Sequence, residues 1–600
     1  MTKLAKLVLD LPSLRQAYAE GLDPAAVVDE VYDRIEAWND PGIFIAMVDR
    51  DEARNQARAL GASPDGRKLW GIPFAIKDNI DFKELPTTAA CPDYAYNPKE
   101  SAAAVERAIA AGAIVIGKLN LDQFATGLVG VRTPYPVPRN AVDPSLVPGG
   151  SSSGSAVAVA AGLLPFTLGT DTAGSGRVPA GLNNIVGLKP TVGLMPSRGV
   201  VSAVRMADVV SVFATSVEDA YQVLQAIGGY DPADAFSRDL AVPKRGPLPP
   251  VFRAAIPDAA SRRFGGGSMA EAAFLATLKD VQAIGGEIVE IDFEPYFAVA
   301  RMLYEGALVA SRYQQIHDFI EEKPEALHPI TRQVTESARR FSAADAFRDL
   351  YRLTELRREL GRIWSRVDAM IVPTFPRALT VEAVLAEPVA LNSELGTYTN
   401  FVNLLDFCAL AVPGRPRSDD VPAGVTLIGP AGADGRLATI GAKLHAAGGV
   451  PIGATGRQPT QPYRIEATAA ADEIGLIVVG AHLAGMPLNG DLLRLGGRFL
   501  RTAETAKSYR LYRLEGTILR PGMLRVTDAD GASIAVELWA LPKANLGQFI
   551  ASIPAPLGFG PVLLADGSTH LGFLVEAIAT QSAIDITHHG GWRAYIASLA

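Results

Sequence analysis

Apolar residues in the first three quarters of the chain follow two alternating spacings. From residue 12 to residue 38 they recur three and four positions apart, which is typical of amphipathic helices. An alanine-rich helical stretch ending at Gly112 then leads into AIVIGK, which is typical of a buried strand. Helix and strand patterns recur at 155–161 with LLPFTLGT, at 268–284 with GGEIVEID and at 344–365 with DAMIVPT. This alternation predicts an α/β fold whose mixed or parallel sheet carries helices on both faces.

The periodicity is lost in ATGRQPTQPY, residues 454–463, where Gly and Pro are combined with polar residues. Such a composition is typical of a linker between compact units. Beyond it lie short β-rich runs separated by turn signals, namely IGLIVVGAHL, YRLYRLEGTILRPGMLRV, IAVELWALP and HLGFLVEAIA. We therefore predict a large domain over residues 1–455, a linker over 456–465 and a smaller mixed α+β domain over 466–600.

Composition narrows the possible partners and cellular setting. The 600 residues are 48% hydrophobic and 20% charged, with a formal net charge of −8, which disfavours nucleic acid or an anionic membrane as partner. Cys91 and Cys408 are the two cysteines, and no CxxC or Cys/His ligand spacing occurs, so we expect neither a disulfide framework nor a metal site. No secretion signal or membrane-spanning run is evident, so we expect a cytoplasmic protein.

The segment 148–180, PGGSSSGSAVAVAAGLLPFTLGTDTAGSGRVPA, holds two Gly/Ser clusters around a small-residue helix and a strand. This order can bring both clusters to one end of the sheet, where open α/β folds place their sites. A P-loop would need a lysine in the cluster, and the spacing of a dinucleotide-binding loop is absent. Gly150, Ser152 and Gly154 match GxSxG, but the preceding NAVDPSLVPGG is turn-forming rather than a strand. The first histidine is His317, which weakens a Ser-His triad without excluding it.

A serine nucleophile without histidine needs another base, and a lysine can serve if burial keeps its amine neutral near pH 7. Lys77 is the candidate, because the apolar run in WGIPFAIKDNID delivers it to the end of a predicted strand. A solvated lysine at a strand end is the alternative interpretation.

Four segments, GIPFAIKDNI, PGGSSSGS, GTDTAGSGRVPAG and VGLKPTVG, resemble the motifs of the amidase signature family in order and spacing. The resemblance covers roughly residues 20–450. It implies that Ser175 is the nucleophile, Ser151 a bridging serine and Lys77 the base that starts the proton relay. It also implies a cis peptide bond between Gly150 and Ser151.

The resemblance further implies an oxyanion hole and a braced loop around the nucleophile. The backbone N–H groups of Thr172, Ala173 and Gly174, with that of Ser175, would form the oxyanion hole. Asp171 and Arg177 would brace this loop. This chain has Gly176 where the family commonly has a bulky residue, which would either widen the site or loosen the turn.

The whole-chain layout resembles the family members that act on allophanate, which join an amidase domain to a C-terminal domain similar to the γ-glutamyl cyclotransferase-like group. By this resemblance Tyr304, Arg312 and Gly127 bind the substrate. We predict that RMLYEGALVASRYQQI is helical, which places Tyr304 and Arg312 about two turns apart on similar faces. Arginine suits the carboxylate of allophanate, because its planar donor fork binds a carboxylate bidentately. A solvated helix face is the alternative for both residues.

In the C-terminal domain, His482 follows an apolar strand in VVGAHLAGMPLN. By resemblance it assists the breakdown of N-carboxycarbamate, and an imidazole titrating near pH 7 could neutralise charge there. A buried structural histidine is the alternative. The resemblance implies that allophanate is converted to ammonia and carbon dioxide without a cofactor, by a homodimer linked to a urea carboxylase or another allophanate-producing enzyme.

Three alternatives stay open at this point. The chain could hydrolyse other small amides, with a C-terminal domain that is only structural. It could be an amidotransferase component that supplies ammonia to partner proteins, although an appended C-terminal domain is not expected there. The C-terminal domain could also be a binding or dimerisation module without chemistry of its own.

Overall fold

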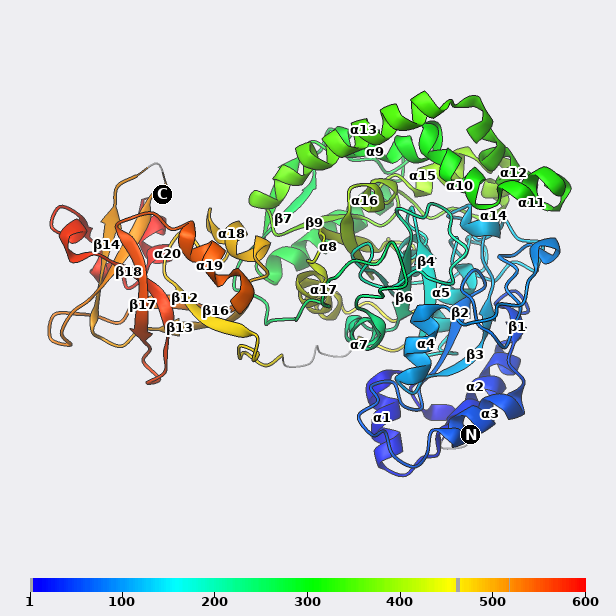
Figure 1. Cartoon of the computed structure of the whole chain (residues 1–600), viewed down its shortest axis with the longest axis horizontal. Coiled ribbons are helices and arrows are strands. Elements are labelled where there is room, and N and C mark those ends of the chain that lie inside the picture. The colour runs from blue at the N-terminus through cyan, green and yellow to red at the C-terminus, as the bar shows by residue number, and fades with distance from the viewer. Residues whose placement is uncertain (1–3, 460–464, 517, 600) are drawn as a thin grey trace.

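The computed structural model describes residues 4–459, 465–516 and 518–599, which form a large part and a smaller C-terminal part (Figure 1). Residues 460–464, inside the predicted linker 456–465, lie outside this description, and the domain limits stay predictions. Among the described residues, no helix combines the length and apolar character needed to cross a membrane.

The large part is built on a mixed sheet of eleven described strands. Across the sheet they are β1 (Phe44–Met47), β3 (Ile114–Leu119), β2 (Pro73–Lys77), β4 (Phe166–Asp171), β6 (Val209–Ala214), β5 (Val186–Lys189), β10 (Phe407–Val412), β11 (Val425–Pro430), β9 (Ala369–Pro373), β7 (Phe252–Pro257) and β8 (Gly286–Ile291). Strand β2 lies between β3 and β4 and is parallel to both, whereas β4 and β6 are antiparallel. Strands β2, β3 and β4 are buried along their whole length, and β2 and β3 accordingly read in the sequence as mainly apolar runs, whereas β4 (FTLGTD) includes buried polar residues.

Helices cover both faces of this sheet, as predicted. They are α1 (Leu11–Ala19), α2 (Pro24–Trp38), α3 (Arg50–Ala59), α4 (Ala103–Ala110), α5 (Ser153–Ala160), α6 (Val178–Leu182), α7 (Val217–Ile227), α8 (Ser268–Ala283), α9 (Glu294–Glu305), α10 (Ala310–Gln315), α11 (His317–Glu322), α12 (Pro329–Glu336), α13 (Ala343–Leu360), α14 (Val381–Ala386), α15 (Ala390–Leu395), α16 (Asn400–Leu404) and α17 (Asp434–Gly448). Short 3-10 helices lie at Leu4–Lys6, Pro92–Tyr94, Gln123–Ala125, Ala307–Val309, Pro324–Ala326, Ser337–Arg340 and Gly361–Ser365.

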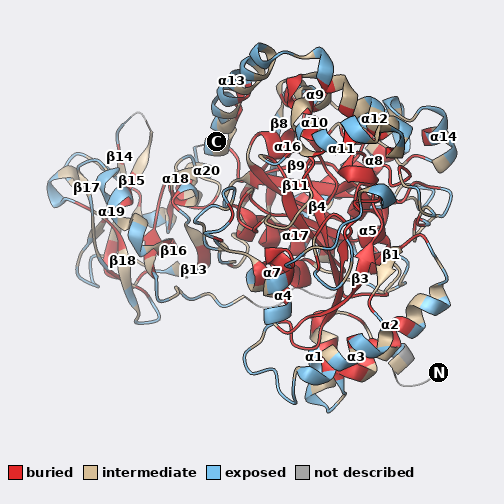
Figure 2. Cartoon of the chain, turned by 45° about the vertical axis from the view of Figure 1, so that its right-hand side comes forward, coloured by how far each residue is buried: buried red, intermediate tan, exposed pale blue. Residues whose placement is uncertain are grey.

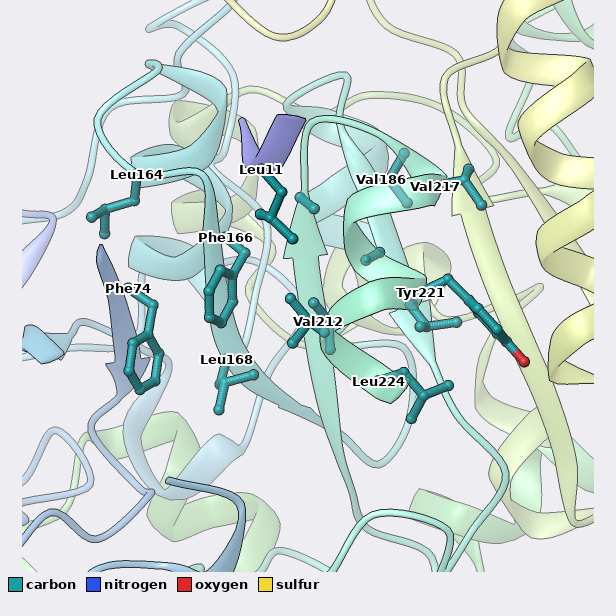
Figure 3. Close-up of a cluster of buried hydrophobic side chains, with 14 of the residues drawn as sticks. Leu11, Phe74, Leu164, Phe166, Leu168, Val186, Val212, Val217, Tyr221 and Leu224 are labelled. Carbon is teal, nitrogen blue, oxygen red and sulfur yellow. The ribbon is translucent and has the colours of Figure 1, made fainter. Parts of the chain in front are cut away.

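Two hydrophobic clusters fill the space between the sheet and its helices. One joins the sheet to α1–α4, α7, α8 and α17, and the other joins it to α9, α13 and α16. Figure 2 shows buried residues concentrated in the sheet and an exposed outer side on α13. In the first cluster the rings of Phe74 and Phe166 stack with centroids 5.1 Å apart (Figure 3). Burial of such a side chain contributes on the order of 2 kcal/mol, so this packing holds β2 firmly against β4.

The C-terminal part has its own sheets and its own core, which confirms the predicted mixed α+β class. One sheet has the order β13 (Arg498–Glu504), β16 (Ala535–Pro542), β12 (Glu473–Val478), β18 (Thr569–Val575) and β17 (Leu557–Leu563). The other has the order β15 (Arg520–Arg525), β14 (Tyr509–Leu514) and β19 (Ile584–Asp585). The helices are α18 (Asn489–Arg494), α19 (Lys543–Ala551) and α20 (Trp592–Ala597), with 3-10 helices at Ala577–Thr580 and Thr587–His589. Their apolar residues pack around the buried Trp539.

Candidate active site

Strand β2 carries Lys77 into the interior, where it meets Ser151. The five residues of β2 are buried, and Lys77 is the last of them. Lys77 Nζ is hydrogen-bonded to Ser151 Oγ at 2.7 Å and to Thr170 Oγ1 at 2.8 Å. Thr170 lies near the end of β4, the strand beside β2. The parallel pairing of these strands places Lys77 beside Thr170, and the turn before α5 brings Ser151, which the sequence analysis also selected, to the same amine. Lys77 is therefore not a solvated lysine.

The surroundings of Lys77 suit a base that works near neutral pH. Complete burial disfavours the charged amine and lowers the pKa of Lys77 to about 7. The carboxylates of Asp122, Asp208 and Asp171 act in the opposite direction. The positive charge of Arg312 lowers the pKa further. A neutral amine can accept the proton of Ser151 while it donates to Thr170, so the pair has the properties that a proton relay needs.

Ser151 lies in a tightly packed turn that precedes α5. The Gly150–Ser151 peptide bond is cis, as predicted. A Cβ at Gly150 would lie 2.0 Å from Asp122 Oδ2, so the position has no room for a side chain. The next residue, Ser152, donates from its Oγ to the carbonyl of Thr170 at 3.2 Å. Within the described residues, no strand leads directly into the GxSxG match, which confirms that this segment is not a strand-to-helix elbow.

Ser175 lies on the loop between β4 and α6, and one ion pair organises that loop. Arg177 donates to the carboxylate of Asp171 from Nε at 2.9 Å and from Nη2 at 2.8 Å, and both side chains are fully buried. Burial alone would raise the pKa of Asp171, but Arg177 holds it below its usual value. The loop is therefore braced as predicted. Ser175 itself is 2% exposed.

The N–H groups of this loop are not equivalent. The Gly174 and Gly176 N–H groups each donate to Asp171 at 3.0 Å. Within the described part of the chain, the N–H groups of Thr172, Ala173 and Ser175 make no such bonds. The Ala173 carbonyl is also held, since it accepts from Thr399 Oγ1 at 2.7 Å. Of the N–H groups predicted to form an oxyanion hole, that of Gly174 already donates to Asp171, whereas those of Thr172, Ala173 and Ser175 are available to a ligand.

Gly176 lies where the structure leaves no room for a side chain. A Cβ there would lie 2.8 Å from Ser211 Cβ on β6, and a Cβ at Gly187 on β5 would lie 2.1 Å from the Gly176 carbonyl. The glycine is therefore required by close packing of the loop on two strands.

Arg312 and Tyr304 meet, as the substrate-binding prediction requires. Arg312 is 3% exposed and donates from Nη2 to Tyr304 Oη at 3.1 Å. Its Nη1 donates to Thr126 Oγ1 at 3.1 Å and to the Ala125 carbonyl at 3.3 Å. Burial excludes the solvated-face alternative for Arg312.

The prediction of one helix over this segment is wrong. Helix α9 ends at Glu305, Gly306 is extended, and a 3-10 helix at Ala307–Val309 leads into α10. Asp349 on α13 accepts the Ala307 N–H at 2.7 Å, which stabilises the break. Tyr304 and Arg312 therefore face each other across a bend.

Gly127 follows Thr126 in a loop that wraps around the carboxylate of Asp122. A Cβ at Gly127 would lie 2.4 Å from Asp122 Oδ2. Asp122 Oδ2 accepts the N–H of Gly130 at 3.0 Å, and Oδ1 accepts that of Arg132 at 2.9 Å. The sequence analysis missed Asp122, although it follows β3 at the sheet edge where open α/β folds hold their sites.

His482 follows β12 along the chain in the C-terminal part, and its exposed fraction is 8%. It borders a cavity of about 270 Å³ together with Asp491, Arg494 and Arg520. Its ring stacks on Phe573 with centroids 5.2 Å apart. Burial lowers the pKa of His482 to about 4, so the expectation that it titrates near pH 7 is wrong and the imidazole is neutral there.

Comparison with known proteins accounts for both parts of the chain. The family model "Amidase" matches residues 26–438, and the model "Allophanate hydrolase C-terminal domain" matches residues 474–597. Urea amidolyase of Saccharomyces cerevisiae is 40% identical over 573 residues, which cover 93% of this chain and 31% of that protein. The chain thus spans about a third of that relative.

Solved structures agree with these matches. Kluyveromyces lactis allophanate hydrolase superposes with a TM-score of 0.76 at 37% identity, covering 99% of this chain and 100% of that one. A glutamyl-tRNA(Gln) amidotransferase component of Thermotoga maritima superposes with a TM-score of 0.62 at 25% identity, covering 77% of this chain and 99% of that one. The chain therefore belongs to the amidase family and carries, beyond its amidase domain, the C-terminal domain found in allophanate hydrolases.

Proposed function

We propose that this chain is an allophanate hydrolase that uses Ser175, Ser151 and Lys77 for its first step. The observation that carries the proposal is the buried contact between Lys77 Nζ and Ser151 Oγ, beside the braced loop that presents Ser175. The full-length match to Kluyveromyces lactis allophanate hydrolase supports the substrate. That match includes the C-terminal domain, which favours this proposal over a role as an amidotransferase component.

In this proposal, Ser175 Oγ attacks the terminal amide carbon of allophanate while its proton passes through Ser151 to Lys77. The oxyanion is held by the Thr172, Ala173 and Ser175 N–H groups. The C–N bond breaks, the proton returns to the leaving nitrogen, and ammonia departs. Water then attacks the acyl-enzyme by the same relay and releases N-carboxycarbamate. No metal or cofactor takes part in these steps.

Arg312 and Tyr304 give the site its preference for an amide that also carries a carboxylate. Arg312 is buried, and its guanidinium lies 5.2 Å from the centroid of the Tyr304 ring, so it is held in one orientation. A buried cation favours an anionic group at this place. Gly127 borders the same place because it follows Thr126, which Arg312 contacts.

Biuret tests this preference, because it is the neutral analogue in which an amide replaces the carboxylate of allophanate. We expect ammonia release from allophanate to exceed that from biuret by roughly 10- to 100-fold in kcat/KM, the value of one hydrogen bond to a charged group. Coupled assay of ammonia with both compounds measures the ratio. Equal rates, or faster turnover of simple aliphatic amides, would contradict the assignment to allophanate and favour another small amide.

For the second step, we propose that the His482 cavity promotes decarboxylation of N-carboxycarbamate. The cavity holds Arg520 and Arg494, the latter paired with Asp491 at 2.9 Å, beside a neutral imidazole, and the two guanidinium groups suit a small dianion. We expect His482→Asn to leave the first ammonia unchanged and to lengthen the lifetime of N-carboxycarbamate, observed by ¹³C NMR. The matched control is His588→Asn, at an exposed histidine of the same domain. An unchanged lifetime in the His482 variant would leave this domain a structural or dimerisation role.

A homodimer and a cytoplasmic location remain parts of the proposal, as does a supply of allophanate from a urea carboxylase or another allophanate-producing enzyme. The similarity to urea amidolyase, a longer protein, supports this link.

A further inference from the structure

A second buried arginine, Arg132, shares Thr126 with Arg312. Arg132 is 3% exposed and donates from Nη1 to the Thr126 carbonyl at 2.8 Å. Arg312 donates to the hydroxyl of the same threonine at 3.1 Å. Arg132 Nη2 also donates to the Pro388 carbonyl at 2.7 Å, which ties the loop to the segment before α15. Thr126 is therefore held from two sides by two cations.

Neither guanidinium has its charge neutralised by a direct partner. Among the described residues, no carboxylate is within salt-bridge distance of Arg132 or Arg312, and the Nε of each is buried without a hydrogen bond. The neighbouring Asp122 gives its oxygens to the backbone N–H groups of Val129, Gly130 and Arg132. The charges of Asp122, on Arg132, and of Asp208, on Arg312, act from beyond salt-bridge distance. Buried cations without a direct counter-ion attract an anionic ligand.

We propose that Arg132 is a positioning residue for the carboxylate of the substrate. It fixes the Thr126 backbone so that the threonine hydroxyl orients Arg312, and its own charge adds to the attraction for an anion. This inference rests on the proposed function, since it concerns the carboxylate of the same amide. It predicts that the chain selects carboxylated amides through two arginines, one in contact with the carboxylate and one behind it.

A purely structural Arg132 would make a different prediction. If it served only to pin the loop to Pro388, its loss would slow charged and neutral amides to the same extent. If it serves the carboxylate, the loss falls on allophanate and appears mainly in KM, because Lys77 on β2 and Ser175 on the loop after β4 are untouched. The ratio of kcat/KM between allophanate and biuret separates the two roles.

The experiment compares Arg132→Gln and Arg132→Lys with wild-type enzyme and with Arg139→Gln. Arg139 is a matched control, because it also donates to a backbone carbonyl, that of Asn39 at 2.6 Å, and its side chain is 54% exposed. We expect Arg132→Gln to lower kcat/KM for allophanate about 10- to 100-fold and that for biuret less than about 3-fold. Arg132→Lys should recover part of the loss, and Arg139→Gln should keep the wild-type ratio.

Equal losses for both compounds, or no loss for allophanate, would overturn the proposal. If biuret turns over too slowly to measure, the affinities for allophanate and biuret can be compared by calorimetry. The Arg132 substitutions are then made in the Ser175→Ala variant, so that no catalysis takes place. Thermal unfolding of each variant shows that it folds, and Arg132→Lys carries the test if Arg132→Gln does not. A wild-type enzyme without preference for allophanate would instead refute the proposed function, so the two failures are distinguishable.

Discussion

Ser175→Ala should reduce ammonia release from allophanate by roughly 10⁴-fold or more, the loss typical of a missing nucleophile. The variant should fold as the wild type does, because it removes one oxygen from a loop that Asp171 and Arg177 brace independently. Steady-state kinetics measure the loss, and thermal unfolding measures the stability.

Ser152→Ala is the matched control for this experiment. Ser152 is the serine of the GxSxG match, and its hydroxyl is engaged with the Thr170 carbonyl. We expect this variant to retain activity within about tenfold of wild type, since it loses one neutral hydrogen bond worth about 1 kcal/mol. An active Ser175→Ala enzyme together with an inactive Ser152→Ala enzyme would show that the nucleophile is Ser152, the serine of the GxSxG match, and not Ser175.

Loss of the Lys77 amine should reduce ammonia release nearly as much as loss of Ser175. In the wild type, the titration of this amine should appear in the pH profile of kcat/KM. The base must be neutral, and its pKa is lowered to about 7. Below that pH the amine is protonated, so kcat/KM should fall about tenfold per pH unit, and above it kcat/KM should level off. Lys77→Arg should be inactive as well, because a guanidinium keeps its proton throughout this range.

Two variants test whether the fall of kcat/KM at low pH, the acid limb of the profile, reflects the titration of Lys77. Arg312 lowers the pKa of Lys77, so Arg312→Gln should move the acid limb to higher pH when biuret is the substrate. Lys189→Met removes another buried lysine, whose Nζ donates to the Phe407 carbonyl at 2.7 Å, and should keep the wild-type profile at whatever rate it retains. An acid limb that moves with Lys189 but not with Arg312 would assign the titration to another group.

The contact between Lys77 and Ser151 and the braced loop around Ser175 agree with the sequence-based expectations because their signals are local. Strands β2 and β3 are mainly apolar runs, Lys77 ends β2, and the loop that holds Ser175 directly follows β4. The sequence predicted less where one group depends on a distant one. The break at Gly306 is stabilised by Asp349, and the low pKa of His482 reflects burial beside Phe549 and Phe573. The local pattern of apolar and polar residues does not predict contacts between residues so far apart in the sequence.

The bend at Gly306 lies in a different layer of the molecule from the groups proposed for bond cleavage. Lys77 ends a sheet strand, and Ser151 and Ser175 lie on the turns beside it. Tyr304 and Arg312 belong instead to the helical layer of α9, the 3-10 turn and α10, drawn in green at the top of Figure 1. A one-residue insertion in that bend would reorient Arg312 and leave the sheet unaltered. Natural selection could therefore change which amide is accepted without rebuilding the apparatus that cleaves it.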